Sequence, residues 1–267
     1  MTPKIKVHEL VTGTVSVKRS HREFSGPAGL RFPSILFDRK WTEPLPVRAW
    51  LVEHPEGLLL VDTGEGAFAS EPAAFEGPDG FFYRKNLRIE QLREEEVDRK
   101  IESIGFKPSD IRWVVLTHLH SDHVDGLRHF PSAEVIVTQA EFNKPFGPYR
   151  PFWPEWFAPT LWHGLSRSLT FRGDISLVAT PGHTLGHQSV LVEDDLGYIL
   201  LAGDLSFSEE QLLNGGLPGI SVGVRESAET RKRVLQLANE RPLVYLPSHD
   251  PDSGNRLRSR QTLTVAK

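Results

Sequence analysis

The stretch 117-Thr-His-Leu-His-Ser-Asp-His-123 places three histidines and an aspartate within six residues. It directly follows Trp113–Leu116, a short apolar run that predicts a buried strand. On an extended chain, side chains two residues apart face the same side, so His118 and His120 can hold one ion together. A turn after them brings the Asp-His pair at 122–123 to a neighbouring position. From the His and Asp frequencies of this chain, the expected count of the pattern H-x-H-x-D-H is on the order of 10⁻³, so we interpret it as a metal-binding motif.

Three further segments each carry one potential ligand directly after a predicted strand. Loops at strand ends gather into sites on a rigid scaffold. Imidazole and carboxylate suit zinc and similar divalent ions, and the chain has no cysteine to offer a thiolate. The three strands are at 175–179, 198–201 and 243–246, and they are followed by His183, Asp204 and His249. The residues allow His118, His120 and His183 to hold one ion and Asp122, His123 and His249 a second, with Asp204 bridging both.

Composition and charge exclude several classes of partner. The 267 residues are 39% hydrophobic and 25% charged with a net charge of −4, as in ordinary globular proteins. The basic residues form no cluster, so the chain is not expected to bind nucleic acid or an anionic membrane surface. No apolar run of about 18 residues exists to span a membrane, and residues 1–10 lack the apolar stretch of a secretory signal. We therefore expect a cytoplasmic protein.

Strand patterns dominate the chain, and helical patterns interrupt them. Further strands are predicted at 7–17, 47–53, 58–61, 134–138 and 189–193. Helices are predicted at 91–104, with Gly105 as the stop, and at 227–240, with Ser227 as the N-cap. Residues 20–45 lack a period and predict a long loop. This order favours an α/β (α+β) fold class with two packed sheets and helices outside, as a single domain over 1–267.

Residues 139–172 form an aromatic-rich segment that contains nine of the 25 aromatic residues and five prolines between 142 and 171. The prolines argue against a regular strand or a long helix. Two interpretations remain open. The segment is a satellite core or an oligomer contact, such as that of a homodimer, or it is a cap that walls a substrate pocket with apolar surface, and both can hold together. Its candidate pocket residues are Tyr149, Trp153, Trp156 and Phe157, and His21 and His163 are packing residues or lie within reach of a substrate.

Together with Leu60-Val61-Asp62-Thr63-Gly64, these motifs resemble the metallo-β-lactamase superfamily, whose fold is an αββα sandwich. Within it the chain is most similar to the N-acyl homoserine lactonase group, because 60, 21 and 45 residues separate His123, His183, Asp204 and His249 in turn. The resemblance runs from Val47 to His249 and implies two divalent metal ions, zinc with Mn, Fe or Co as alternatives. It also implies that Asp62 orients a ligand, whereas an ordinary turn residue is the alternative. His187 is interpreted as structural.

The expected function is hydrolysis of an ester-like bond, with a lactone as the preferred substrate class. Divalent ions lower the pKa of water, and Asp122 is placed to pass a proton to the leaving group. The substrate would be a small molecule with an apolar part. A thioesterase, a phosphodiesterase and a non-catalytic metal-binding scaffold remain alternatives.

Phe207 departs from the pattern of the lactonase group, which has a tyrosine three residues after the bridging aspartate. Phenylalanine has no donor to stabilise an oxyanion. Either homoserine lactones are poor substrates, or another donor such as Tyr149 or His21 substitutes, or the natural substrate differs.

A second motif, Gly219-Ile220-Ser221-Val222-Gly223, matches the elbow of serine hydrolases. That elbow needs a strand before it and a helix after it, and residues 214–218 predict a loop instead. We therefore expect Ser221 not to be a nucleophile.

Overall fold

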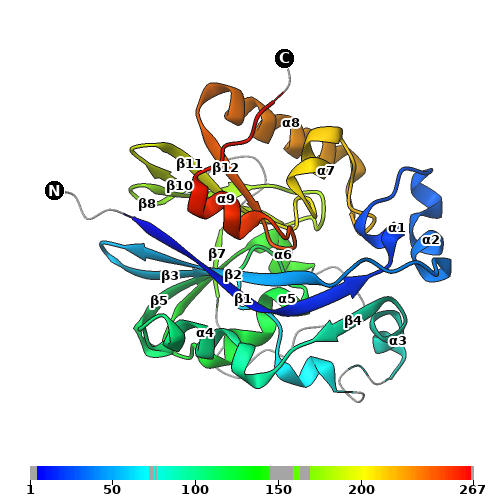
Figure 1. Cartoon of the computed structure of the whole chain (residues 1–267), viewed down its shortest axis with the longest axis horizontal. Helices are drawn as coiled ribbons and strands as arrows, with labels where there is room; N and C mark the ends of the chain where they lie inside the picture. Colours follow the sequence, from blue (N-terminus) through cyan, green and yellow to red (C-terminus); the bar gives the residue numbers. More distant parts are fainter. Residues whose placement is uncertain (1–4, 72–74, 76, 145–158, 163–168, 266–267) are drawn as a thin grey trace.

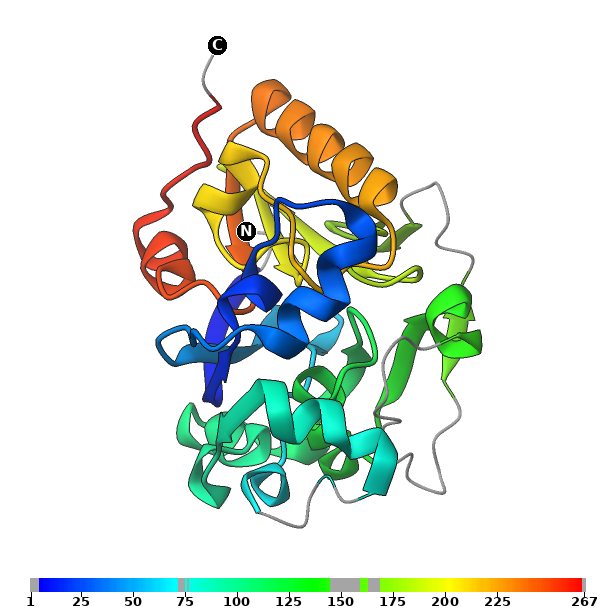
Figure 2. The same cartoon turned by 90° about the vertical axis from the view of Figure 1, so that its right-hand side faces the viewer.

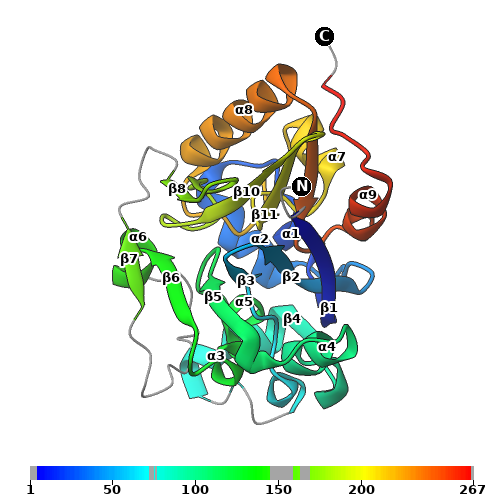
Figure 3. The same ribbon diagram turned by 90° about the vertical axis from the view of Figure 1, so that its left-hand side faces the viewer.

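The computed structural model describes residues 5–71, 75, 77–144, 159–162 and 169–265. Its first sheet contains β1 (Lys6–Val17), β2 (Leu45–His54), β3 (Gly57–Val61), β4 (Leu87–Glu90), β5 (Ile111–Val115), β6 (Glu134–Thr138) and β7 (Thr160–Trp162). The second contains β8 (Leu169–Arg172), β9 (Ile175–Ala179), β10 (Gln188–Asp194), β11 (Gly197–Gly203) and β12 (Leu243–Pro247). Across the sheets the orders are β4-β1-β2-β3-β5-β6-β7 and β12-β11-β10-β9-β8. Figure 3 shows the second sheet above the first.

Helices cover the outer faces of both sheets (Figure 1), which confirms the predicted sandwich. The helices are α1 (Arg19–Arg22), α2 (Arg31–Phe37), α3 (Gly77–Asn86), α4 (Val97–Ser103), α5 (Ser121–Val124), α6 (Gln139–Asn143), α7 (Glu209–Asn214), α8 (Val224–Glu240) and α9 (Ser253–Ser259). In Figure 2, α1 and α2 lie between the half of the molecule that carries α8 and the half that carries α3. Among the described residues, no helix is long and apolar enough to cross a membrane.

The alternation of side chains along the strands builds two layers of core. Leu59 and Val61 of β3 face the second sheet and pack in one cluster with Val190 of β10. Leu60 points to the opposite face and packs in another cluster with Ile101 of α4. Because both faces of the sheet are covered, its central strands appear in the sequence as continuous apolar runs. Each fully buried aliphatic side chain contributes about 1.5–3 kcal/mol, which fixes the strand ends that carry the site.

The prediction of a loop over residues 20–45 was wrong in part, because α1 and α2 lie at its start and within it. Pro33 falls in the first turn of α2, where its missing N–H removes no hydrogen bond within the helix. A helix of seven residues is too short to show a clear period in the sequence.

Two predicted helix starts were also wrong. The helix predicted from Gln91 begins at Val97, because Glu96 is extended and its carboxylate is held by Arg128 and His129. The other begins at Val224 with Gly223 as its N-cap, so Ser227 lies inside the helix rather than at its N-cap. The predicted stop is confirmed, because Gly105 has a positive φ of 93°, which favours glycine.

The aromatic-rich segment 139–172 is regular at both ends, contrary to the expectation of an irregular excursion. It begins with α6, and β7 pairs with β6 in the first sheet. At its other end β8 pairs with β9 in the second sheet. Residues 145–158 and 163–168, which include Tyr149, Trp153, Trp156, Phe157 and His163, lie outside the described residues.

Candidate metal centre

The seven ligand-type residues predicted from the sequence gather at one edge of the sandwich, in segments that follow β5, β9, β11 and β12, and two of the seven lie in α5. They form two groups whose candidate ligand atoms lie within 4.8 Å of one another. The first group is His118, His120, His183 and Asp204, and the second is Asp122, His123 and His249.

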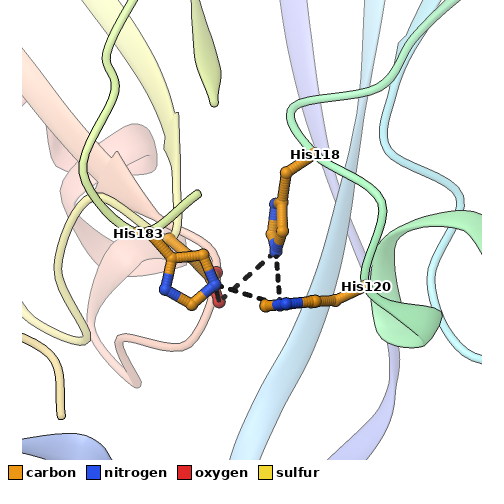
Figure 4. A group of neighbouring side chains, drawn as sticks. His118, His120 and His183 are labelled. Carbon is orange, nitrogen blue, oxygen red and sulfur yellow. Dashed lines mark hydrogen bonds and ion pairs between the residues drawn. The ribbon is translucent and has the colours of Figure 1, made fainter. Parts of the chain in front are cut away.

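In the first group, ring nitrogens converge from two loops (Figure 4). His120 Nδ1 lies 2.9 Å from His118 Nε2 and 3.0 Å from His183 Nε2. Asp204 Oδ2 lies 3.5 Å from His183 Nε2 and 4.0 Å from His118 Nε2. All four residues except His120 are buried.

In the second group, His249 Nε2 lies 3.3 Å from Asp122 Oδ2, and His123 Nε2 lies 3.8 Å from the same oxygen. The other oxygen of Asp204, Oδ1, lies 3.4 Å from His123 Nε2 and 3.3 Å from His249 Nε2. Asp204 therefore presents one carboxylate oxygen to each group, as a bridging residue must.

Hydrogen bonds from behind fix the orientation of the rings. The Nδ1 atoms of His183 and His249 lie 2.8 Å and 2.9 Å from the carbonyl oxygens of Ile220 and Pro46. Since a carbonyl only accepts, each Nδ1 carries the proton and donates it. In the neutral ring Nε2 is then the acceptor and faces the centre, which is the form of imidazole that binds a metal ion.

Asp62 performs the same task for His123. Its Oδ2 lies 2.7 Å from His123 Nδ1, and Thr117 donates to both of its oxygens at 2.7 and 2.8 Å. The backbone of Asp62 has a φ of 59°, a strained value for a residue other than glycine. Backbone strain of this kind costs about 1–3 kcal/mol and persists only where surrounding contacts hold it. The structure thus places Asp62 directly behind a ligand-type histidine.

His187 lies behind Asp204, and the sequence assigned it no part in the site. Its Nε2 accepts the backbone N–H of Asp204 at 3.0 Å, and its Nδ1 lies 3.1 Å from the carbonyl oxygen of Thr180. A Cβ on Gly203 would meet His187 Nε2 at 2.6 Å, and Gly203 has a φ of 58°. The sequence offers one signal for the contact between His187 and Asp204, namely that His187 lies four residues after His183.

Two further buried residues, neither of them predicted from the sequence, join loops that carry ligand-type side chains. Glu141 accepts hydrogen bonds from Leu119 N, Thr184 Oγ1 and Gly186 N at 3.2, 2.6 and 3.1 Å, which ties the loop after β5 to the loop after β9. Arg48 donates to the carbonyl oxygen of Asp250 at 2.7 Å and so holds the loop of His249.

The protonation states of the first group suit a metal ion. Burial and the neighbouring histidines hold the pKa of His118 and of His183 well below the ordinary value, although Asp204 opposes the shift. Burial raises the pKa of Asp204, but His249 and His123 outweigh it and hold that pKa well below its usual range. Neutral imidazoles and an ionised carboxylate are the forms in which these side chains bind metals.

The second group carries a strong negative field. Burial opposes protonation of His249, but Asp204 and Asp122 outweigh it and raise its pKa to about 10. The pKa of His123 is likewise raised against the effect of burial, by Asp62, Asp204 and Asp122. The field that stabilises an imidazolium also favours a divalent cation at the same place.

A cavity of 470 Å³ opens on the centre. Five ligand-type residues line its inner end, which we call the floor: His120, Asp122, His183, Asp204 and His249. Its wall is apolar and comes from β1, β4, α2, α3 and the loop after β11, with Val15, Val17, Phe32, Phe82, Leu87, Ile89 and Phe207 among the lining residues. One of the two interpretations of 139–172 placed an apolar wall there, and of the lining residues named here only Phe207 was a candidate from the sequence. His21 also lines the cavity, in agreement with one of its two interpretations from the sequence.

Ser221 lies in a loop before α8, and no strand immediately precedes it in this described part of the chain. Its hydroxyl donates to the carbonyl oxygen of Pro218 at 3.1 Å, and its carbonyl oxygen accepts from Arg31. The neighbouring Ile220 holds His183, so this loop supports the centre rather than forming a second one.

The profile of the metallo-beta-lactamase superfamily matches residues 42–249. The chain belongs to this superfamily. It is 28% identical over 229 residues to the N-acyl homoserine lactonase AttM of Azorhizobium caulinodans, covering 78% of this chain and 83% of that relative. It is 30% identical over 216 residues to an N-acyl homoserine lactonase of Bacillus cereus, covering 77% and 82%.

Solved structures share the fold. One is an N-acyl homoserine lactone hydrolase with the product N-hexanoyl-L-homoserine bound at the catalytic metal center, which matches at a TM-score of 0.78 and 23% identity over 96% of both chains. Another is AidC, a dizinc quorum-quenching lactonase in complex with a product, at a TM-score of 0.65 and 18% identity over 94% of this chain and 89% of that one. The buried His and Asp groups of this chain are typical of the dinuclear metal site of the superfamily, and the chain is a metal-dependent hydrolase of that superfamily.

Proposed function

We propose that this protein hydrolyses lactones that carry an apolar part, of the N-acyl homoserine lactone type, at a centre of two divalent metal ions. The observation that carries the proposal is the two groups of ligand-type residues at the floor of one cavity with an apolar wall. The names of the relatives from Azorhizobium caulinodans and Bacillus cereus support the choice of a lactone.

We assign His118, His120 and His183 to one ion and Asp122, His123 and His249 to the other, with Asp204 between them. The chain's own atoms fit this assignment. Within the described residues, the buried atoms His123 Nε2 and Asp204 Oδ1 have no hydrogen-bond partner. Two ligands on a tetrahedral zinc ion lie roughly 3.4 Å apart for a zinc–nitrogen distance of about 2.1 Å. The separations of 3.3 to 4.0 Å at Asp204 are close to that value. The His and carboxylate set without cysteine favours zinc.

When bound, divalent ions supply Lewis acidity, which lowers the pKa of water and polarises a carbonyl oxygen. Asp122 then handles the proton. Burial raises its pKa, but His123 and His249 outweigh burial and hold that pKa well below the ordinary value, so Asp122 rests as a carboxylate. It must therefore accept a proton from the attacking water before it can pass one to the leaving alkoxide, and it acts first as a base and then as an acid.

The wall selects the other part of the substrate. Val15 pairs with Ile89 and Val17 with Leu87 across β1 and β4, so both strands present apolar side chains to the cavity. An acyl or alkyl chain placed there leaves water, which contributes about 0.8 kcal/mol for each buried methylene group. A cavity of this size suits a small ring with a tail rather than a polymer.

A panel of lactones, thioesters and phosphodiesters, assayed with zinc, cobalt or manganese of known stoichiometry, tests the proposal. We expect lactones to give the highest kcat/KM and elemental analysis to find close to two metal ions per chain. A thioester or phosphodiester that exceeds every lactone by tenfold would assign the other activity. A stoichiometry of one or less that added metal does not raise contradicts the two-ion centre.

A further inference from the structure

A second pocket, of 410 Å³, gathers basic side chains that are far apart in the sequence. We call it the basic pocket, and it is lined by Lys18, Leu36, Phe37, Asp38, Arg39 and Lys85. The carboxylate of Asp38 is already engaged, because it accepts hydrogen bonds from the backbone N–H and the hydroxyl of Ser20 and from the backbone N–H of Lys40. Among the described residues, none of the three cations of the pocket forms an ion pair. The basic pocket therefore carries an excess of positive charge that the protein itself does not pair.

Lys18 is the buried cation of this pocket, at 7% exposed. Its Nζ lies 3.7 Å from the centroid of the Trp41 ring, and the guanidinium carbon of Arg88 lies 4.0 Å from the same centroid. No hydrogen bond reaches this Nζ within the part of the chain that the structure describes. Burial and then the charge of Arg88 lower the pKa of Lys18, although the charge of Asp38 opposes the shift. An aromatic ring offsets only part of the cost of a buried ammonium group, so the partner that suits this position is an anion.

The alternation of side chains along β1 places the basic pocket behind the wall of the cavity. Val17 pairs with Leu87 across β1 and β4, and both line the cavity, whereas Ser16 pairs with Arg88. The backbone of Lys18 stays extended, with a φ of −65° and a ψ of 146°. Because paired residues share a face and successive residues alternate, Lys18 and Arg88 lie on the face opposite to the cavity. The basic pocket is thus separate from the space that would hold the substrate tail.

The rest of the basic pocket is apolar. Leu36 and Phe37 of α2 line it, and Phe37 is 78% exposed. The ammonium group of Lys85 lies 5.6 Å from the ring centroids of Phe37 and Phe81. Cations beside an exposed aromatic ring suit a ligand with two parts, an oxyanion that pairs with the cations and an apolar chain that covers the ring. A hydrated inorganic ion would leave the ring in water.

We propose that the basic pocket binds an alkyl oxyanion, a carboxylate or a phosphate that carries an aliphatic chain. The pocket is built on the end of β1, on α2 and on α3, and each of these elements also contributes to the apolar wall of the cavity. The bound anion therefore contacts that wall from behind. The inference does not depend on the proposed function, although the acid released from an acyl lactone belongs to the same class.

Calorimetric titration of the metal-loaded protein with octanoate tests the inference. We expect Lys18→Met and Lys85→Met each to weaken octanoate binding at least about tenfold, the effect of losing one charge-assisted hydrogen bond. Lys40→Met removes the same charge from a nearby position that does not line the pocket, so it should change the affinity less than about twofold. Binding of octanoate at the metal centre is common to all four proteins and cancels in the comparison.

Two further probes separate the charge from the chain. Octanol lacks the charge and inorganic phosphate lacks the chain, and each should bind this pocket at least about tenfold more weakly than octanoate. Octanoate binding that survives both pocket substitutions, or that falls equally in Lys40→Met, overturns the inference. Equal binding of phosphate and octanoate also overturns it, because the apolar residues then play no part. If Lys18→Met does not fold, Lys85→Met carries the test, since Lys85 is exposed.

Cosedimentation with phosphatidylcholine vesicles, with and without phosphatidylglycerol, identifies the source of the anion. Binding to the anionic vesicles that is lost in Lys85→Met assigns a lipid head group, whereas binding of free octanoate alone assigns a soluble amphiphile. If neither octanoate nor the anionic vesicles bind, the basic pocket has no ligand of this class and the inference is wrong.

Discussion

The floor and the wall of the cavity are held in place by different forces. Two side chains of the floor are oriented by directional hydrogen bonds, His183 to the carbonyl oxygen of Ile220 and His249 to that of Pro46. The wall is held by apolar packing, and towards the solvent it ends in half-exposed side chains such as Phe32, which is 42% exposed. A directional network fails when one partner is lost, whereas a packed surface adjusts by degrees. Substitutions in the floor should therefore have nearly all-or-none effects and those in the wall graded ones.

The largest effect is expected at Asp204. Asp204→Asn removes a negative charge that faces both groups of ligands, so metal content should fall and kcat/KM should drop by at least about 10³-fold. Elemental analysis and kinetics on the same preparation measure both. His120→Ala should act in the same way.

Ser221→Ala is the control for these variants, because it removes a buried hydroxyl whose partner is Pro218 rather than a residue of the floor. Its kcat/KM should stay within about twofold of wild type. If a folded, metal-loaded Ser221→Ala protein is inactive, the nucleophile is the serine and the floor has been misinterpreted.

Glu141 should have the next largest effect, on stability. Burial outweighs its hydrogen bonds from Thr184, Leu119 and Gly186 and raises its pKa from 4.5 to about 7. The folded state therefore binds more protons than the unfolded state between these two values, so the stability that Glu141 contributes is complete below pH 4.5 and is lost as the pH rises through 7. Glu141→Gln does not titrate. Relative to wild type it should gain on the order of 3 kcal/mol in free energy of unfolding between pH 4.5 and pH 8.

Urea unfolding of both proteins at the two pH values measures this difference, since titration of the floor is common to both and cancels. A difference that is constant with pH would show that the carboxyl of Glu141 does not titrate in this range. Glu141, which joins the loops of the floor, would then not show the large effects expected of the floor residues themselves.

The wall should respond by degrees. Phe82→Ala removes an aromatic ring from the cavity wall without touching a ligand-type residue. A hydrophobic pocket discriminates by about 1–3 kcal/mol per methylene group, so kcat/KM should fall more for long acyl chains than for short ones. A series from butanoyl to decanoyl homoserine lactone measures the slope. Equal losses along the series would mean that the tail does not lie on α3.

The floor was visible in the sequence because it is local. Four ligand-type residues fall within six positions, and the other three each follow a predicted strand, where an extended chain must turn. The wall consists of ordinary apolar residues that meet only through pairing. Val15 and Ile89 are neighbours across β1 and β4 but lie 74 positions apart, and no motif marks either of them. Single residues that hold the loops of the floor, such as Arg48 and Glu141, could not be predicted either, because no motif marks them.

The smallest effect on kcat is expected at Phe207, which lines the wall of the cavity and also contacts His249 of the floor. Its ring is buried, stacks on His249 with 5.4 Å between centroids and meets His21 edge-on at 6.0 Å. Phe207→Tyr adds a donor beside the floor. Losing one oxyanion donor costs about 10²–10³ in kcat when nothing replaces it, so restoring one should raise kcat on homoserine lactones severalfold if it is lacking.

His21 decides whether a donor is lacking at all. Burial lowers its pKa to about 3, so its ring is neutral and keeps one N–H, and its Nδ1 has no partner among the described residues. If this imidazole serves the oxyanion, His21→Phe should lower kcat about tenfold in wild type and much less in Phe207→Tyr, because the new hydroxyl takes over the same oxygen. If wild type is fast and neither substitution changes kcat, both rings are wall, and the metal centre alone stabilises the oxyanion.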